Sequence, residues 1–137
     1  MKVYLTRRYS FPASHRLHNA TFTDVENQRV YGKCNNPHGH GHNYNVEVTV
    51  SGKVDPRTGM VCNLADLDGY VNSRIVSVFD HTNLNDVPEM QGMIPSTENL
   101  CMRIYEMMRT GFTHATVERI RIEETPKNSF EYGTELR

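Results

Sequence analysis

The stretch GKCNNPHGHGHNYNVEV, which runs from Gly32 to Val48, places a cysteine and three histidines directly before a clear strand pattern. From His40 to Val50, every second side chain points to one face of an extended chain, and the later members of that set are valines. The pattern predicts a half-buried strand whose first two inward positions are His40 and His42. A His-x-His pair by itself is more often structural or solvated than metal-bound, so its meaning depends on what lies near it.

A third histidine turns this pair into a candidate metal site. Residues two apart on a strand point the same way, with Cα atoms about 6.6 Å apart, so His40 and His42 can share one ion. His15 ends an N-terminal strand pattern over residues 3–15, on the same face as its apolar odd-numbered residues. Catalytic zinc sites typically use three protein ligands and one open position. If the two strands pair, the three imidazoles predict a divalent-ion site, for which zinc is the first candidate, although iron, nickel and copper also suit imidazole.

The rest of the chain predicts the fold class. Helical spacing covers residues 64–78, with Asn63 as N-cap, and residues 97–109, with Ser96 or Thr97 as N-cap. This order predicts an α+β fold in a single domain over residues 1–137, an antiparallel four-stranded sheet with two helices on one face. The other predicted elements are a long loop at 17–39 and strands at 60–64, 113–125 and 129–136, with a bulge near Glu118.

The other face of this sheet has mixed polarity, with residues such as Tyr4, Arg8 and Glu47. A closed assembly of several chains would cover that face and remove the sheet edges.

Composition excludes several classes of protein. The chain has 137 residues and a formal net charge of −1 without a basic block, which argues against a protein that binds nucleic acid through phosphates. No apolar run approaches the roughly 20 residues of a membrane span, and the N-terminal stretch MKVYLTRRYSF has no secretory signal pattern. Three scattered cysteines do not form a disulfide scaffold, which indicates a reducing, cytoplasmic setting.

Three further positions carry reactive side chains. Cys34 follows a lysine within a polar loop, and is a fourth ligand, a buried inert thiol or a proton carrier. Asp80 and His81 end a predicted helix, where the carboxylate can orient the imidazole and raise its basicity, or where both simply stop the helix. One of Glu123 and Glu124 is predicted as a rim charge, and the other as a partner for a guanidine-like or aminopyrimidine edge.

Six blocks of the chain occur in a familiar order and spacing: FPASHRL, GKCNNPHGHGHNY, VDPRTGMVCNLADL, FDHTNLN, PSTENL and IRIEET. In these blocks, from about Leu5 to Glu124 and beyond, the chain closely resembles the 6-pyruvoyl-tetrahydropterin synthase family of the tunnelling-fold superfamily. The resemblance implies a homohexamer of two stacked trimers, whose sheets close into a barrel with sites at subunit interfaces. One departure is Pro126, where the animal enzymes have an acidic residue; it concerns the local loop and not the glutamate before it.

The resemblance also assigns roles to residues. His15, His40 and His42 match the family's zinc ligands. Cys34 matches the catalytic cysteine, a proton-transfer base that does not bind the metal. Asp80 and His81 match an Asp-His pair that works with the cysteine. Glu124 matches a glutamate that anchors the aminopyrimidine edge of the pterin. Thr97 and Glu98 match two residues that line the pterin pocket from a neighbouring subunit.

The implied reaction converts 7,8-dihydroneopterin triphosphate to 6-pyruvoyl-tetrahydropterin with loss of triphosphate. It is a lyase reaction with an internal redox change, in which Zn²⁺ acts as a Lewis acid. Cys34 and the Asp80–His81 pair would move protons on the two faces of the substrate side chain. Arg16 and Lys33, which lie beside the metal-binding blocks, are predicted to bind the triphosphate.

Three alternatives stay open. The 6-carboxy-tetrahydropterin synthases of queuosine biosynthesis are similar in fold, zinc site and starting substrate, but have a shorter interval between the cysteine and the His-Gly-His block than the six residues from Cys34 to His40. A side-chain-cleaving aldolase relative would carry a glutamate in or near the place of the cysteine. A non-catalytic pterin- or zinc-binding module is disfavoured by the joint presence of Cys34, Asp80 and His81.

Overall fold

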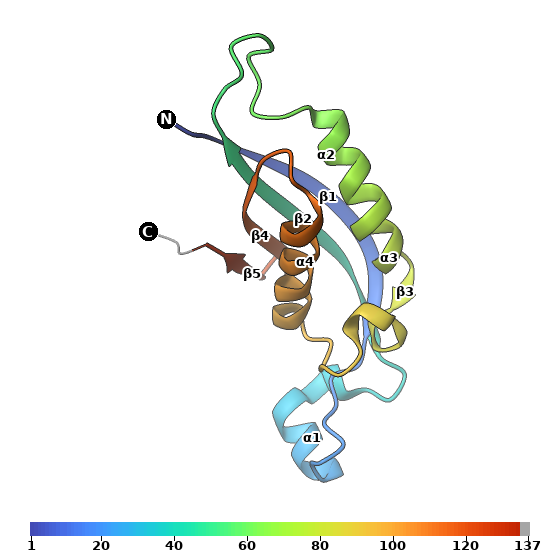
Figure 1. The fold of residues 1–137 in the computed structure, drawn as a ribbon. Helices are drawn as coiled ribbons and strands as arrows, with labels where there is room; N and C mark the ends of the chain where they lie inside the picture. Colours follow the sequence, from blue (N-terminus) through green and yellow to red (C-terminus); the bar gives the residue numbers. More distant parts are fainter. Residues whose placement is uncertain (135–137) are drawn as a thin grey trace.

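Two long strands, β1 (Val3–His15) and β2 (His40–Gly52), pair antiparallel along their whole length and form the centre of the sheet. In the computed structural model, which describes residues 1–134, β4 (Thr116–Thr125) pairs with the other side of β2, and β5 (Asn128–Gly133) pairs with β4 (Figure 1). The short strand β3 (Thr82–Asn83) runs parallel to the end of β1. The sheet order is therefore β3-β1-β2-β4-β5.

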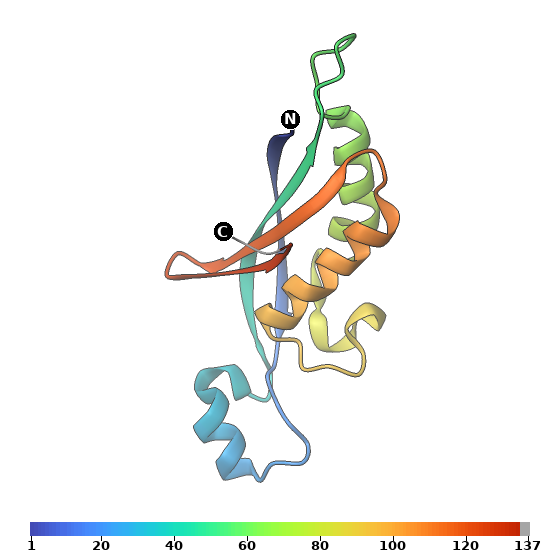
Figure 2. The same ribbon diagram turned by 60° about the vertical axis from the view of Figure 1, so that its left-hand side comes forward.

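The helices cover one face of this sheet, as predicted (Figure 2). A continuous helical segment consists of α2 (Leu64–Val71), a π-helical turn (Asn72–Val76) and α3 (Ser77–Phe79), and the second long helix is α4 (Thr97–Gly111). The side chains of Asn63 and Ser96 cap α2 and α4, as their sequence positions predict. Short 3₁₀ turns occupy Gly32–Asn35, Leu84–Asp86 and Pro88–Met90.

The core lies between the sheet and these helices. The inward residues of β2 and β4 are fully buried against α2 and α4 because both surfaces carry apolar side chains at matching periods. This burial fixes the register of β2, since a shift of one residue would turn every valine outward. Representative core residues are Val46, Val48, Val50, Leu67, Ile75, Leu100, Ile104, Ile120 and Ile122.

The α+β class and the helix placement are confirmed, whereas some elements differ from the prediction. The sheet has five strands and not four, because β3 is too short to show any periodicity. The predicted strand at 60–64 is wrong: the segment bends and then enters α2. The predicted bulge near Glu118 is confirmed by a register shift between Thr49 and Val50 on the facing strand. The last strand was predicted to reach residue 136, and residues 135–136 lie outside the described part.

The predicted loop at 17–39 contains a helix, α1 (Asp24–Tyr31), followed by the 3₁₀ turn that carries Cys34. Thr23 and Glu26 form a capping box at its start. Only Asn27 of α1 is buried, so the helix has no apolar stripe that a hydrophobic pattern could reveal. The helix lies beyond the end of the sheet, away from α2 and α4 (Figure 2).

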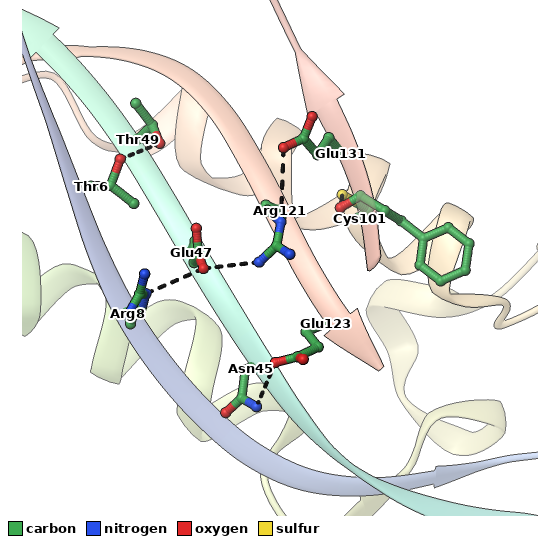
Figure 3. Close-up of polar contacts among 10 residues, drawn as sticks. Thr6, Arg8, Asn45, Glu47, Thr49, Cys101, Arg121, Glu123 and Glu131 are labelled. Atoms are coloured by element: carbon green, nitrogen blue, oxygen red, sulfur yellow. Dashed lines mark hydrogen bonds and ion pairs between the residues drawn. The ribbon is translucent and has the colours of Figure 1, made fainter. Parts of the chain in front are cut away.

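The face of the sheet opposite the helices is polar. Glu47 on β2 accepts a hydrogen bond from Arg8 on β1 (3.2 Å) and another from Arg121 on β4 (3.0 Å), and Arg121 lies 3.9 Å from Glu131 on β5 (Figure 3). Asn45 donates to Glu123 on the same face, at 3.3 Å. Among residues 1–134, no helix is both long and apolar enough to cross a membrane.

Candidate active site

The end of the β1–β2 pair brings three histidines together. His15 on β1 lies directly opposite His40 on β2, and His42 is the next inward residue of β2. The ring centroids are 5.0 Å apart for His15 and His40, 5.1 Å for His15 and His42, and 4.7 Å for His40 and His42. One nitrogen from each ring lies within 4.8 Å of the others, so the three side chains can bind one ion.

The protonation of these rings suits a metal. The Nε2 atoms of all three are buried and have no hydrogen-bond partner among the described residues. His15 Nδ1 lies 2.8 Å from the carbonyl oxygen of Pro95, which only accepts, so Nδ1 carries the proton and Nε2 keeps its lone pair. Burial lowers the pKa of His15 and of His42, and both rings are therefore neutral at neutral pH. Three buried imidazole nitrogens without a hydrogen-bond partner among the described residues are a donor set that fits a divalent cation such as zinc.

Glu124 lies beside this cluster. One carboxylate oxygen is 3.5 Å from His42 Nε2, and the other accepts a hydrogen bond from the Thr97 hydroxyl. Glu124 continues the inward face of β4 after Ile122, whereas Glu123 turns to the polar face and bonds Asn45. The sequence left open which glutamate lies on which face, and the structure answers this: Glu124 faces the cluster and Glu123 faces away from it.

Cys34 shares the electrostatic environment of Glu124. The thiol is half-buried on the 3₁₀ turn after α1. Burial raises its pKa, and the negative charge of Glu124 raises it further. A cation held by the three imidazoles would act in the opposite direction and favour the thiolate.

Asp80 and His81 form a pair of their own. His81 Nδ1 lies 2.9 Å from Asp80 Oδ1, an approach that neighbouring residues seldom make. It is made because the backbone of His81 has a φ of 57°, and its N–H donates to the Pro12 carbonyl at 2.7 Å. The His81 side chain is 78% exposed. Among the described residues, no hydrogen bond or ion pair links the Asp80–His81 pair to Cys34 or to the metal-site histidines.

The other predicted residues are spread around the site. Thr97 is buried and contacts Glu124 within the same chain, and Glu98 is exposed. Arg16 Nε donates to the backbone carbonyl of Asn35 at 3.1 Å. Lys33 is exposed and lines a groove of about 610 Å³ together with His40.

Two residues near the site were not predicted. Tyr44 is fully buried, its hydroxyl lies 3.3 Å from His15 Nδ1, and its ring meets His42 edge to face at 5.5 Å. The only sequence signal for Tyr44 was its position on the inward face, two residues after His42. Asn35, which follows Cys34, is buried and forms several hydrogen bonds; no sequence pattern distinguishes it from Asn36.

Comparison with known proteins agrees with this fold. A family model described as "6-pyruvoyl tetrahydropterin synthase" matches residues 4–135. The chain belongs to the 6-pyruvoyl tetrahydropterin synthase family. A protein named 6-pyruvoyl tetrahydrobiopterin synthase from Poecilia reticulata is 50% identical over 133 residues, which cover 96% of this chain and 90% of the relative. The protein of the same name from Homo sapiens is 44% identical and covers 96% of this chain and 91% of its own length.

Solved structures of the 6-pyruvoyl tetrahydropterin synthase family include the enzyme of Caenorhabditis elegans. That structure superposes with a TM-score of 0.91 at 38% identity, and the match covers 98% of this chain and 97% of that chain. The tunnelling fold and the family membership that the sequence blocks predicted are thereby confirmed.

Proposed function

We propose that this member of the family converts 7,8-dihydroneopterin triphosphate to 6-pyruvoyl-tetrahydropterin and triphosphate, as a zinc-dependent lyase in the cytoplasm. The observation that carries the proposal is the group of three buried imidazole nitrogens of His15, His40 and His42, which have no hydrogen-bond partner among the described residues and lie next to the Glu124 carboxylate. The imidazoles can hold the metal while the carboxylate holds the pterin, and the substrate side chain would then lie between them.

The ligand set explains why a metal is part of the proposal. His15, His40 and His42 would hold the ion and leave a position open for substrate. When bound, zinc supplies Lewis acidity that makes the protons beside the substrate's hydroxyl oxygens easier to remove. The hydrogen bond from His15 Nδ1 to Pro95 fixes the tautomer that this role requires.

Glu124 is the proposed anchor of the pterin. An aminopyrimidine edge offers two adjacent N–H groups, and an ionised carboxylate can accept from both. Thr97 holds one carboxylate oxygen and thereby limits rotation of the side chain. Its contact with Glu124 lies within one chain, so Thr97 supports the pterin pocket of its own subunit in this proposal. Glu98 is the exposed neighbour that would complete a pocket across a subunit boundary.

Cys34 and the Asp80–His81 pair are the proposed proton carriers. Cys34 lies near Glu124 and would take a proton from one face of the substrate side chain. His81, oriented by Asp80, would act on the other face, and its exposure supports a role that is completed by a second subunit. Arg16 and Lys33 remain the proposed contacts of the triphosphate.

The free edges of the sheet support the proposed hexamer. Four long strands alternate in direction across each chain, so β5 of one copy would lie antiparallel to β1 of the next copy in a ring with rotational symmetry. Such a ring leaves no free edge between copies and encloses the polar face.

Product identification tests the proposal directly. The zinc-loaded protein is incubated with dihydroneopterin triphosphate, and the products are identified by mass spectrometry. A pyruvoyl product supports the proposal, a carboxy product would assign the chain to the alternative reaction, and tight pterin binding without turnover would make it a binding module. Cys34→Ala is expected to keep its zinc and lose turnover; loss of zinc from this variant would make Cys34 a ligand and contradict its role as base.

A further inference from the structure

The residue after Cys34 is a buried asparagine, Asn35, whose side chain joins neighbouring segments of the chain through hydrogen bonds. Asn35 has 3% of its surface exposed, although it lies in the most polar part of the sequence. Its Nδ2 donates to the Leu17 carbonyl at 2.8 Å and lies 2.9 Å from His18 Nδ1, and its Oδ1 accepts from Gln28 Nε2 at 3.3 Å. Because the Leu17 carbonyl only accepts, the orientation of the Asn35 amide is fixed.

These bonds tie the cysteine turn to the strand that carries His15. The N–H of Leu17 donates to the carbonyl of Cys34 at 2.8 Å, and the C=O of Leu17 accepts from Asn35. Both backbone groups of Leu17 are therefore bound by two consecutive residues of the turn. Leu17 follows His15 by two residues, so only a short stretch of backbone separates this clamp from the metal-site histidines.

Among the described residues, neither α1 nor the cysteine turn contributes a buried apolar side chain. The buried residue of α1 is the polar Asn27, and Asn35 is the buried residue of the turn. The segment therefore depends on directional hydrogen bonds, and of these the Asn35 amide connects α1, the turn and the exit of β1 at one point. Arg16 adds a bond to the backbone carbonyl of Asn35, at 3.1 Å.

We propose that Asn35 is a positioning residue, which sets the distance between the Cys34 thiol and the substrate held at the three histidines. The proposal rests on the proposed function, in which Cys34 transfers a proton. Proton transfer between positioned groups requires contact at hydrogen-bond distance, and a displacement of about 1 Å can lower the rate roughly 100-fold.

The test compares Asn35→Leu with Asn27→Leu. Both substitutions are close in volume and remove a buried amide from the same segment without adding charge. Within residues 1–134, however, the hydrogen bonds of the Asn27 side chain go to Asn19 and Thr23, and none goes to the cysteine turn. For Asn35→Leu we expect kcat to fall about 10- to 100-fold, with KM within about twofold of the unchanged protein and the zinc content unaltered. Asn27→Leu should keep kcat near that of the unchanged protein.

A second readout does not depend on turnover. The rate of Cys34 alkylation by iodoacetamide, measured by mass spectrometry of the cysteine peptides, should rise in Asn35→Leu because the turn loosens, whereas Cys62 serves as an internal reference. If Asn35→Leu does not fold, Gln28→Leu removes only the bond to the amide oxygen, and a smaller effect of the same kind is expected.

Three results would overturn the proposal. They are equal kinetics and alkylation in the Asn35 and Asn27 variants, a rise in KM with unchanged kcat, or loss of zinc from Asn35→Leu. Failure of the proposed function is distinguishable, since it would show as turnover retained in Cys34→Ala whatever the Asn35 variants do.

Discussion

At the scale of single residues, the backbone of His15 lies so close to Gly39 that it leaves no room for a side chain at position 39. Gly39 has a φ of 72°, and a Cβ at this position would lie 2.9 Å from the carbonyl oxygen of His15. Gly59 is a matched control, because it has a φ of 73° and nothing within 4 Å of its added Cβ. Left-handed backbone costs a residue with a side chain roughly 1–2 kcal/mol, and this cost applies to both positions.

Gly39→Ala is therefore expected to destabilise the protein by more than Gly59→Ala and to weaken zinc binding at least about 10-fold, because the clash separates His15 from His40. Urea unfolding and competition with a zinc chelator measure the two effects. Equal zinc affinities in the two variants would mean that the contact between Gly39 and His15 does not hold the metal site.

Tyr44 offers a second test at this scale. Tyr44→Phe removes the hydroxyl beside His15 Nδ1 and keeps the ring that stacks on Phe11 at 5.6 Å. Loss of a group that orients a metal ligand typically lowers affinity 10- to 100-fold, so we expect zinc affinity to fall by about 10-fold while the fold is retained. Tyr105→Phe, in a ring that packs on Tyr132, should leave the affinity unchanged. Unchanged affinity in Tyr44→Phe would remove Tyr44 from the site.

The sequence allowed the three-histidine cluster to be predicted because strand parity is a local property. His15, His40 and His42 each lie on a face whose apolar members are known from the sequence, so pairing of two strands was enough to bring them together. The choice between Glu123 and Glu124 stayed open in the sequence pattern, and only the resemblance named Glu124 as the anchor of the pterin. The role of Asn35 could not be predicted, because its hydrogen-bond partners are brought together only by the tertiary structure.

At the scale of elements, α2 is fastened to β1 by a charged clamp. Asp68 of α2 accepts two hydrogen bonds from Arg7, at 3.0 and 2.8 Å, and one from Tyr9 at 2.7 Å. The Arg7 hydrogen bonds, followed by that of Tyr9, hold the pKa of Asp68 below its usual value of 3.8. The clamp therefore contributes stability above the pKa of the unfolded state, and this contribution is lost as the pH falls through the lower pKa of the folded state.

Asp68→Asn is accordingly expected to lower the free energy of unfolding at pH 7 and to flatten its decline below about pH 4. Urea unfolding at pH 7 and pH 3 measures both effects. Glu106→Gln removes only an exposed pair with Arg109 on α4 and should change little. An Asp68→Asn protein that loses stability on acidification as steeply as the unchanged chain would contradict the role of the clamp.

Two elements escaped prediction for the same physical reason. α1 and β3 bury too few apolar side chains to leave a period in the sequence, since α1 buries only Asn27 and β3 has two residues. β3 is held by its pairing with β1, which is distant in sequence. α1 is held by hydrogen bonds to Asn19, Thr23 and Asn35, which are polar residues close to it in the sequence. The long elements, whose burial is apolar, were predicted with nearly correct bounds.

At the scale of the whole molecule, the proposed function makes two separate groups of side chains into parts of one site. The histidines and Glu124 gather at one end of the sheet, where Glu124 also acts electrostatically on Cys34, whereas the Asp80–His81 pair is exposed beyond β1 and has no bonded contact with them among the described residues. A proton carrier with 78% of its side chain exposed is poorly shielded from water. In the proposed hexamer, the pair of one subunit would be covered by the site of the next.

This arrangement predicts that two inactive variants complement each other. Cys34→Ala and His81→Ala are co-expressed with different tags, and assemblies that contain both chains are purified. If each site takes Cys34 from one chain and His81 from its neighbour, random assembly leaves about a quarter of the sites with both residues intact, so about a quarter of the normal turnover should return. Sedimentation must show that each variant assembles like the unchanged chain. A mixture as inactive as its two parents would place both residues in the site of a single chain, and the exposed pair would then need a movement of its own turn to reach the substrate.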